Sequence, residues 1–360
     1  MGSIAVIGAG NVGQAVAGHM TLRGHDVRLY SPWPSEFEPI DARGGIELTG
    51  DAEGTALPAL LTTELDKAVD SVDVIVVAAP AFAHRTLARE LAEVVEAEQL
   101  VLYQPSALGS GLELARSFAQ MNRTPCLIAE TATSLYTCRL QGPAQVFLGR
   151  IKPSVRFAST PYGAVNDVQQ RLSRYFDDRF IPDADALTVG LSRIGAVYHV
   201  PPALFNLKSV EDGARLPHNT LATPRISELI DALDQERVNL ASRLGVAAIT
   251  FEEFMTRSYG VTEGTLPERI QKSYGPLNFP EPDSVKHRYF TEDIPFSMVV
   301  WSSLAKQIGL PMPLTDSVIK ISSVLCGQDW YANARTVEEL GLVGANAEEI
   351  KSAFLTGRRS

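Results

Sequence analysis

Two short segments in the second half of the chain hold the residue types of acid–base chemistry. His199 lies in the apolar stretch Gly195–Asn206, and Arg288 and Asp293 lie in a stretch that mixes cations, aromatic residues and carboxylates. Histidine changes charge near neutral pH, and a paired carboxylate orients its ring and stabilises the imidazolium. The planar fork of an arginine suits bidentate binding of a carboxylate. On this interpretation His199 and Asp293 form an acid–base pair, and Arg288 clamps a substrate carboxylate.

Each of these residues also has a structural alternative. The apolar surroundings of His199 slightly favour a satisfied core histidine over an acid–base group at an interdomain cleft. Asp293 fits the N-cap of a helix that starts near Pro295. Arg288 fits a solvated surface charge. The residue pattern by itself leaves these alternatives open.

A third segment with chemical potential is the glycine-rich turn Gly8-Ala-Gly-Asn-Val-Gly13 at the start of the chain. It follows a predicted strand and opens a predicted helix, which is the context that makes this motif specific for dinucleotides. Gly8 permits the tight turn, Gly10 lets the backbone approach a pyrophosphate, and Gly13 allows close helix–strand packing. The helix N-terminus adds N–H donors and a favourable dipole. We therefore expect a nicotinamide dinucleotide to bind along this turn, which also includes Asn11 and Val12.

The end of the second predicted strand bears on which dinucleotide binds. NAD-binding domains usually carry Asp or Glu there, whereas this chain has Ser31. The first carboxylate after Ser31 is that of Glu36. A serine hydroxyl can donate to a 2′-phosphate, and Arg28 and Arg43 are candidate cationic partners that equally suit a solvated surface. The pattern favours NADP(H), with Ser31 in the cofactor site and NAD(H) as the alternative.

The order of predicted elements indicates two domains. Strands and helices alternate in the first half, which is typical of a doubly wound, mostly parallel α/β sheet. Longer helical patterns follow after about residue 185. We expect a Rossmann domain over 1–180 and a mostly α-helical substrate and catalytic domain over 181–360. The predicted strands are 3–7, 25–30, 73–80, 99–103, 125–130 and a late pair within 149–158, and the predicted helices are 14–23, 85–98, 221–244, 251–259, 295–308 and 314–325.

Composition narrows the function classes. The 360 residues carry a net charge of −10, which argues against nucleic acid and anionic membrane surfaces as partners. The three cysteines, Cys126, Cys138 and Cys326, lack metal-ligand spacing, so we expect no metal site. Nothing at the start of the chain resembles a signal peptide, and no apolar run is long enough to cross a bilayer. We expect a cytoplasmic protein, with a homodimer as the default assembly.

Taken together, these segments resemble the opine dehydrogenases (the octopine/nopaline dehydrogenase family), most closely their compact bacterial members. The resemblance covers nearly the whole chain, and the histidine and arginine–aspartate segments are far more specific than the glycine turn. The residues that carry it are Gly8–Asn11, Glu130–Arg139, Ala196–Pro201 with Asn206, Arg288–Asp293 and Arg335–Leu342.

The resemblance implies a reductive condensation. An amino acid and a 2-oxo acid such as pyruvate form an imine, and a hydride from NAD(P)H reduces it to a secondary amine. By the same resemblance His199 and Asp293 are the catalytic dyad and Arg288 holds the oxo-acid carboxylate. Asn206 is expected to contact the substrate or the nicotinamide, although it equally suits a turn cap.

Two other functions remain open at this stage. A carbonyl reductase of the 2-oxopantoate or glycerol-3-phosphate type would rely on a catalytic lysine, and Lys208 is the lysine nearest the right place. A dinucleotide-binding sensor without turnover is the second alternative.

Overall fold

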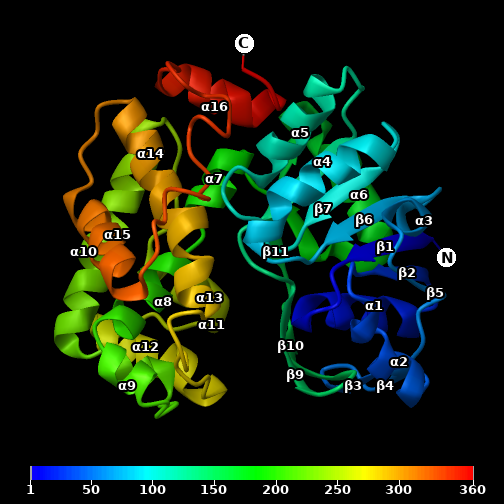
Figure 1. The fold of residues 1–360 in the computed structure, drawn as a ribbon, viewed down its shortest axis with the longest axis horizontal. Helices are drawn as coiled ribbons and strands as arrows, with labels where there is room; N and C mark the ends of the chain where they lie inside the picture. Colours follow the sequence, from blue (N-terminus) through cyan, green and yellow to red (C-terminus); the bar gives the residue numbers. More distant parts are fainter. Residues whose placement is uncertain (1, 360) are drawn as a thin grey trace. The chain divides into compact units, whose positions relative to one another are not determined.

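A computed structural model describes residues 2–359 and divides the chain into two compact units (Figure 1). The first unit comprises Met1–Gly190 with Ser352–Ser360, and the second comprises Leu191–Lys351. The domain boundary expected at residues 180–181 falls within strand β12 (Phe180–Pro182) of the first unit.

An eight-stranded sheet forms the centre of the first unit. Its strand order is β12-β11-β8-β7-β6-β1-β2-β5, and β8 with β11 is its one antiparallel pair among the described residues. The predicted α/β Rossmann class is thereby confirmed. Besides β12, the strands are β1 (Ser3–Ile7), β2 (Asp26–Tyr30), β5 (Leu60–Thr62), β6 (Val74–Val77), β7 (Leu100–Tyr103), β8 (Leu127–Thr131) and β11 (Val155–Thr160).

Both faces of this sheet are covered, which explains its near-continuous apolar strands. Alternate residues of β1 belong to two different hydrophobic cores. Ile4 and Val6 belong to the first core, and Ala5 and Ile7 belong to the second. The first core includes residues of α1 (Asn11–Leu22) and α6 (Val165–Phe176). The second includes residues of α3 (Leu65–Val69), α4 (His84–Val94) and α5 (Ser110–Gln120).

A second, four-stranded sheet packs into the first core and was not predicted. Its order is β4-β3-β10-β9, with β3 at Ile46–Gly50, β4 at Gly54–Ala56, β9 at Tyr136–Gly142 and β10 at Gln145–Ile151. The strand pair predicted within 149–158 is therefore wrong as a pair. β10 pairs with β9 and β3, whereas β11 joins the large sheet beside β8. The turn between them redirects the chain from one sheet to the other, and this long-range pairing leaves no local signal.

The second unit is helical, as predicted. An isolated bridge between Pro217 and Pro280 is the one β-pairing outside the named strands among the described residues. The predicted helix at 295–308 begins as a π-helical turn, η7 (Ile294–Met298), before it continues as α14 (Val299–Gln307). The other main helices are α7 (Ala186–Leu191), which leads into this unit, α8 (Gly195–Leu204), α9 (Leu207–Glu211), α10 (Pro224–Arg243), α11 (Phe251–Tyr259), α12 (Leu266–Tyr274), α13 (Arg288–Thr291), α15 (Pro313–Cys326) and α16 (Ala347–Thr356), whose last turns belong to the first unit.

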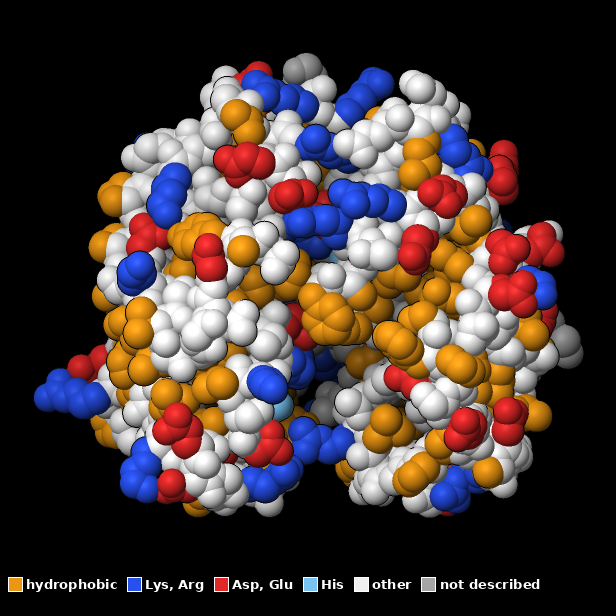
Figure 2. Space-filling model, viewed as in Figure 1, with side chains coloured by type: hydrophobic (Ala, Val, Ile, Leu, Met, Phe, Trp, Pro, Cys, Tyr) orange, Lys and Arg blue, Asp and Glu red, His pale blue; other side chains and the backbone are white. Residues whose placement is uncertain are grey.

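The described residues were also compared for surface charge, membrane-spanning helices and groups of metal-binding side chains. Acidic and basic side chains are interspersed over the face drawn in Figure 2, so binding of an anionic substrate depends on individual cations. Within residues 2–359, no helix is both long and apolar enough to span a membrane. The same residues contain no group of three or more His, Cys, Asp or Glu side chains placed to hold a metal ion.

Candidate active site

The glycine turn has the geometry that its sequence predicts. Gly8 has a φ of +110°, and its N–H donates to the carbonyl of Tyr30 at 2.8 Å. A Cβ added to Gly13 would lie 1.7 Å from the Gly8 carbonyl oxygen, so only glycine fits there. At Gly10, by contrast, an added Cβ would meet no atom within 4 Å. The turn is thus closed on the side of the sheet and open at Gly10, as a bound pyrophosphate requires.

The start of α1 completes this phosphate-binding surface. The carboxamide oxygen of Asn11 accepts the N–H of Leu140 on β9 at 2.7 Å, which ties the helix N-terminus to the second sheet. Val12 packs against the core. The first N–H groups of α1 lack acceptors within the helix and favour an anion. The residues present therefore fit a dinucleotide.

Ser31 lies beside this turn, because Tyr30 is hydrogen-bonded to Gly8. The Ser31 hydroxyl is buried and donates to the Glu36 carboxylate at 2.5 Å, and it accepts the N–H of Trp33 at 3.2 Å. Glu36 belongs to the short helix η1 (Pro34–Glu36), which folds the chain back toward β2. The Glu36 carboxylate therefore lies at the end of the second strand, although Glu36 is five residues further along the chain than Ser31.

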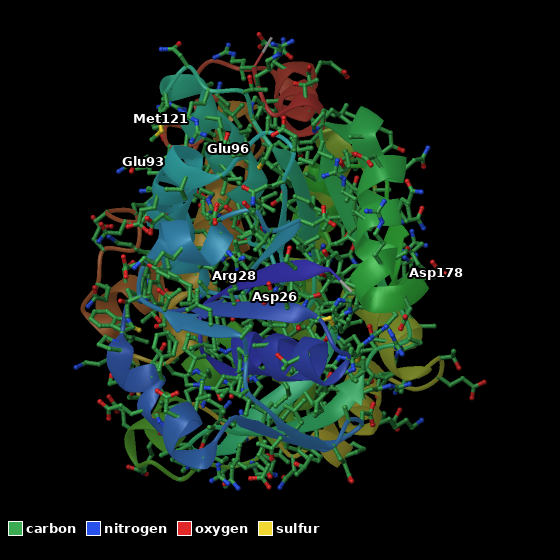
Figure 3. The ribbon with its side chains drawn as sticks, turned by 90° about the vertical axis from the view of Figure 1, so that its right-hand side faces the viewer. Asp26, Arg28, Glu93, Glu96, Met121 and Asp178 are labelled. Atoms are coloured by element: carbon green, nitrogen blue, oxygen red, sulfur yellow. The ribbon has the colours of Figure 1, made fainter. Side chains whose placement is uncertain are left out.

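The two candidate cations for a 2′-phosphate are engaged elsewhere. Arg28 (Figure 3) donates to the backbone carbonyls of Lys67 and Asp70 at 3.1 and 2.6 Å. Arg43 forms an ion pair with Glu47 at 2.7 Å. Both arginines thus have structural partners.

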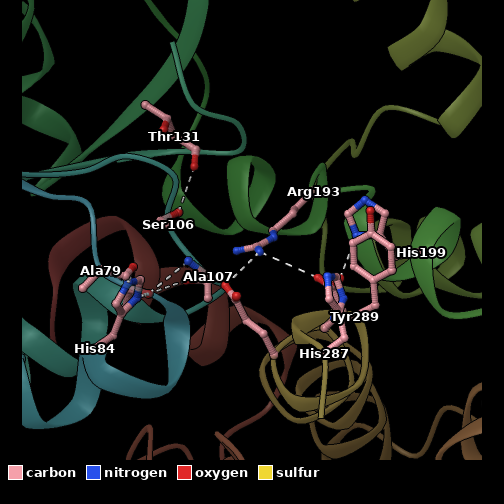
Figure 4. Close-up of polar contacts among 12 residues, drawn as sticks. Ala79, His84, Ser106, Ala107, Thr131, Arg193, His199, His287 and Tyr289 are labelled. Carbon is pink, nitrogen blue, oxygen red and sulfur yellow. Dashed lines mark hydrogen bonds and ion pairs between the residues drawn. The ribbon is translucent and has the colours of Figure 1, made fainter. Parts of the chain in front are cut away.

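The second unit brings His199, labelled in Figure 4, to within hydrogen-bond distance of Asp293. His199 Nδ1 lies 2.8 Å from Asp293 Oδ2, and the side chain of Asp293 is 1% exposed, against 18% for His199. Asp293 stands at the N-cap position of η7, as the structural alternative expects, but it has helical backbone angles and its side chain makes no cap hydrogen bond. A hydrogen bond at Nδ1 directs the other ring nitrogen, Nε2, toward whatever binds at the site.

Local features of α8 position His199. Gly195 lies one turn before it, and a Cβ there would lie 3.1 Å from Asp293 Oδ1 and 3.5 Å from His199 Nδ1. Pro202 has no N–H for the carbonyl of Tyr198 four residues earlier. That carbonyl instead faces His218 Nε2 at 3.4 Å. The helix therefore leaves room for the dyad and uses its proline to hold a second, buried histidine.

The surroundings of the dyad shift the pKa values of both partners. Burial lowers the pKa of His199 below its usual value, and Asp293 only partly opposes this. Burial acts to raise the pKa of Asp293, but the positive charges around it prevail and hold that pKa below its usual value. At neutral pH the resting dyad is therefore a neutral imidazole beside an ionised carboxylate.

Tyr289 and Arg288 border the dyad. The Tyr289 ring stacks on the His199 ring with centroids 4.0 Å apart, and the Arg288 guanidinium carbon lies 5.5 Å from the Tyr289 centroid. Arg288 is exposed and makes no ion pair among the described residues. Its fork is therefore available to a carboxylate near the reacting atoms.

Two other candidates have structural partners. The Asn206 amide donates to the carbonyls of Pro202 and Leu221 at 2.8 and 3.5 Å, which matches the turn-cap alternative. Lys208 is 87% exposed and pairs with Asp212 one helical turn later. Neither contact points to substrate.

Sequence inspection missed Arg193, Glu36, Gly195 and Tyr289 as parts of these sites. Glu36 lies five residues after Ser31, and Tyr289 directly follows Arg288. Their closeness in the chain to these candidate residues is the sequence signal that points to them. Arg193 lies just before the histidine helix and Gly195 is its first residue, and their residue types alone indicate no role.

Comparison with known proteins assigns the family. Residues 182–326 match the family described as NAD/NADP octopine/nopaline dehydrogenase, alpha-helical domain, and residues 4–153 match the ketopantoate reductase family PanE/ApbA. Over 351 residues the chain is 30% identical to an opine dehydrogenase from Arthrobacter sp. (strain 1C), covering 97% of this chain and 98% of that protein. The chain belongs to the opine dehydrogenase family. It is an NAD(P)-dependent oxidoreductase of CH–NH bonds that reductively condenses an amino acid with a 2-oxo acid.

Solved structures confirm the fold of this family member. An octopine dehydrogenase solved with NADH and L-arginine aligns over 100% of this chain and 99% of its own, with a TM-score of 0.80 and 18% identity. A yersinopine dehydrogenase with bound NADP+ aligns over 96% and 98%, with a TM-score of 0.74 and 14% identity. A Rossmann unit followed by a helical unit is thus shared across these proteins.

Proposed function

We propose that His199 and Asp293 are the acid–base dyad of this condensation and that Arg288 binds the carboxylate of the oxo acid. The 2.8 Å contact between the two dyad side chains carries the proposal. A buried carboxylate that binds one ring nitrogen of an imidazole leaves the other nitrogen to exchange a proton with the substrate. General acid–base catalysis requires this arrangement.

The proton transfers follow from the condensation. The amine nitrogen attacks the carbonyl carbon of the oxo acid, and the resulting hydroxyl must leave as water. Neutral His199 accepts a proton from the attacking nitrogen at Nε2, and the alkoxide takes a proton from solvent to become that hydroxyl. Protonated His199 then gives its proton to the hydroxyl, while Asp293 stabilises the imidazolium and fixes its orientation. Loss of water leaves the protonated imine, and NAD(P)H, held along the glycine turn when bound, would supply the hydride that reduces it to the secondary amine. In the reverse direction neutral His199 accepts the proton.

Arg288 orients the oxo acid in this scheme. A guanidinium that binds both carboxylate oxygens fixes the plane of the neighbouring carbonyl. The acceptor in this proposal is a 2-oxo acid such as pyruvate, and the donor is an amino acid. Asn206 as a substrate ligand stays a prediction, and its two backbone contacts favour the structural alternative.

For the cofactor, the sequence favours NADP(H), and the contacts around Ser31 instead support NAD(H). The Glu36 carboxylate would repel a 2′-phosphate and would accept a hydrogen bond from a ribose 2′-hydroxyl. With Arg28 and Arg43 engaged by other groups, no compensating cation has been identified at this place. We propose NAD(H) as the preferred cofactor, bound along Gly8–Gly13 with Glu36 at the adenosine ribose.

The proposal also places the enzyme in the cytoplasm, which is supported by three free cysteines. A homodimer remains the default expectation for its assembly. Light scattering of the purified enzyme tests the second point, and fractionation of the native host tests the first.

A substrate screen tests the proposed reaction. NADH or NADPH oxidation is followed with pyruvate and other 2-oxo acids, each with and without single amino acids, and products are identified by mass spectrometry. We expect consumption only when both substrates are present, with a secondary amine dicarboxylate as product. Consumption with the oxo acid alone would support the carbonyl reductase. Tight cofactor binding without any consumption would support the sensor.

A further inference from the structure

Arg193, which is labelled with His199 in Figure 4, lies in the connection between α7 and α8 and approaches the oxygen of Asp293 that does not contact His199. Its side chain is 10% exposed, and its Nη2 lies 3.7 Å from Asp293 Oδ1 and 3.5 Å from Glu292 Oε1. The other oxygen of Asp293, Oδ2, bonds His199. The two oxygens of one buried carboxylate are thus divided between the histidine and this arginine.

A buried carboxylate needs such a partner. Asp293 is 1% exposed, and its Oδ1 makes no hydrogen bond within the described chain. Removing an ionised carboxylate from water is costly unless a positive charge lies close to it. The imidazole cannot supply that charge permanently, because it is neutral for part of the catalytic cycle. Arg193 is charged throughout.

We propose that Arg193 is a positioning residue for the reaction, which keeps Asp293 ionised and its Oδ2 turned toward His199 through the whole proton-transfer cycle. The inference rests on the proposed role of the dyad. Arg193 acts through Asp293 and is not assigned a contact with substrate.

The charges around the dyad set the expected effect on its titration. Arg193 and Arg288 both lower the pKa of His199, although burial is the largest cause and Asp293 acts the other way. Without the positive charge of Arg193, the pKa values of Asp293 and His199 should both rise. The titratable and charged groups that face the dyad from the surrounding elements are Arg193, Arg288, His218, His287 and the phenol of Tyr289, whereas Glu292 faces Arg193 and Arg288.

The test compares Arg193→Met and Arg193→Lys with wild-type enzyme in the oxidative direction. In that direction kcat/KM rises with pH as His199 becomes neutral. For Arg193→Met we expect this acid limb to move to higher pH by about one unit and kcat to fall by about tenfold. Arg193→Lys should restore most of both values, because it returns the charge. Cofactor affinity and melting temperature show whether each variant is folded.

Glu292→Gln is the matched control, since it removes a second negative partner of Arg193 and leaves Asp293 untouched. It should keep the wild-type pH profile. An unshifted profile in Arg193→Met, or an equal shift in Glu292→Gln, would overturn the inference. If Arg193→Met does not fold, Arg193→Gln and the degree of rescue by Arg193→Lys decide the same point.

Asp293→Asn separates this inference from the proposed function. If Asp293→Asn loses turnover while Arg193→Met behaves as wild type, only the role of Arg193 fails. If Asp293→Asn keeps wild-type turnover and pH dependence, the proposed dyad itself is wrong.

Discussion

The imidazole of His199 and the phenol ring of Tyr289 lie face to face, with centroids 4.0 Å apart and ring planes 11° from parallel. Tyr289 directly follows Arg288, so one short helix, α13, presents both the stacking ring and the carboxylate clamp. The stack defines the plane of the imidazole, and the hydrogen bond that Nδ1 donates to Asp293 defines its rotation within that plane. Together these two contacts leave one orientation for Nε2, and the following predictions depend on it.

Removing either member of the dyad should abolish most turnover. His199→Asn and Asp293→Asn should each lower kcat by roughly 10²-fold or more, because proton transfer to the leaving hydroxyl loses its donor or its orientation. The double variant should be little worse than either single variant, since the two groups act as a unit. Steady-state kinetics of the three variants tests this, with dinucleotide affinity as the control. Fully additive losses would contradict a coupled pair.

Changing the fork of Arg288 should affect the oxo acid more than the amino acid. Arg288→Lys keeps the charge but loses bidentate geometry, and Arg288→Met loses both. We expect Arg288→Met to raise the KM for the oxo acid by about 10²-fold, from two charge-assisted hydrogen bonds worth about 1.5 kcal/mol each. The KM of Arg288→Lys for the oxo acid should lie between the values of Arg288→Met and the wild type.

The exposed Arg225, paired with Glu228 on the same unit, provides a control for this series. Arg225→Lys should leave both KM values unchanged. Equal effects of Arg288→Met on both substrates would argue against a specific oxo-acid clamp.

Gly13 and Gly10 of the turn should respond differently to alanine. In Gly13→Ala the new Cβ would overlap the Gly8 carbonyl, so we expect a loss of about 3 kcal/mol or more in the free energy of unfolding. In Gly10→Ala the Cβ points into open space, so stability should not change. Its Cβ would instead occupy the place of the pyrophosphate and weaken NADH binding. Thermal melts and fluorescence titration together distinguish the two; an unaffected NADH affinity in Gly10→Ala would mean that the phosphates bind elsewhere.

Neutralising Glu36 should change cofactor discrimination. Glu36→Gln removes the charge that repels a 2′-phosphate and weakens the acceptor for the ribose hydroxyl. We expect the ratio of NADPH to NADH affinity to rise by about tenfold, the equivalent of about 1.4 kcal/mol. Glu38→Gln, an exposed carboxylate two residues further on, is the matched control. If the wild-type enzyme prefers NADPH and Glu36→Gln does not change that preference, the prediction of NADP(H) binding from Ser31 would be supported instead.

Buried His218 should make the enzyme less stable as the pH falls. Burial is the largest cause that lowers its pKa from 6.5 to about 3, so the unfolded state binds the proton first. The contribution of the neutral form is complete above about pH 6.5 and is lost progressively as the pH falls toward about 3. One proton corresponds to a slope of about 1.4 kcal/mol per pH unit. Urea unfolding of wild type and His218→Phe between pH 7 and about pH 5 measures the difference; parallel slopes would show that His218 does not titrate between the two states.

The sequence by itself determined the features that depend on residues close together in the chain. The glycine turn is one of them: Gly8 and Gly13 lie five positions apart, and their contact is built into the strand–turn–helix geometry. The alternation of apolar strands and helices likewise predicted the sheet, because strands buried on both faces must be apolar throughout. The family resemblance then connected the distant histidine and arginine–aspartate segments.

Only the tertiary structure decided which side chains meet. His199 and Asp293 are 94 positions apart, and Arg193 reaches Asp293 from another connection, so no local pattern reveals that one carboxylate serves both. Glu36 reaches Ser31 because η1 reverses the chain, a turn that spacing along a strand does not predict. Asn206 has the right residue type for a ligand, yet its amide satisfies backbone carbonyls. Residue type determines what a side chain is able to do, whereas the packing of distant segments determines which partner it has.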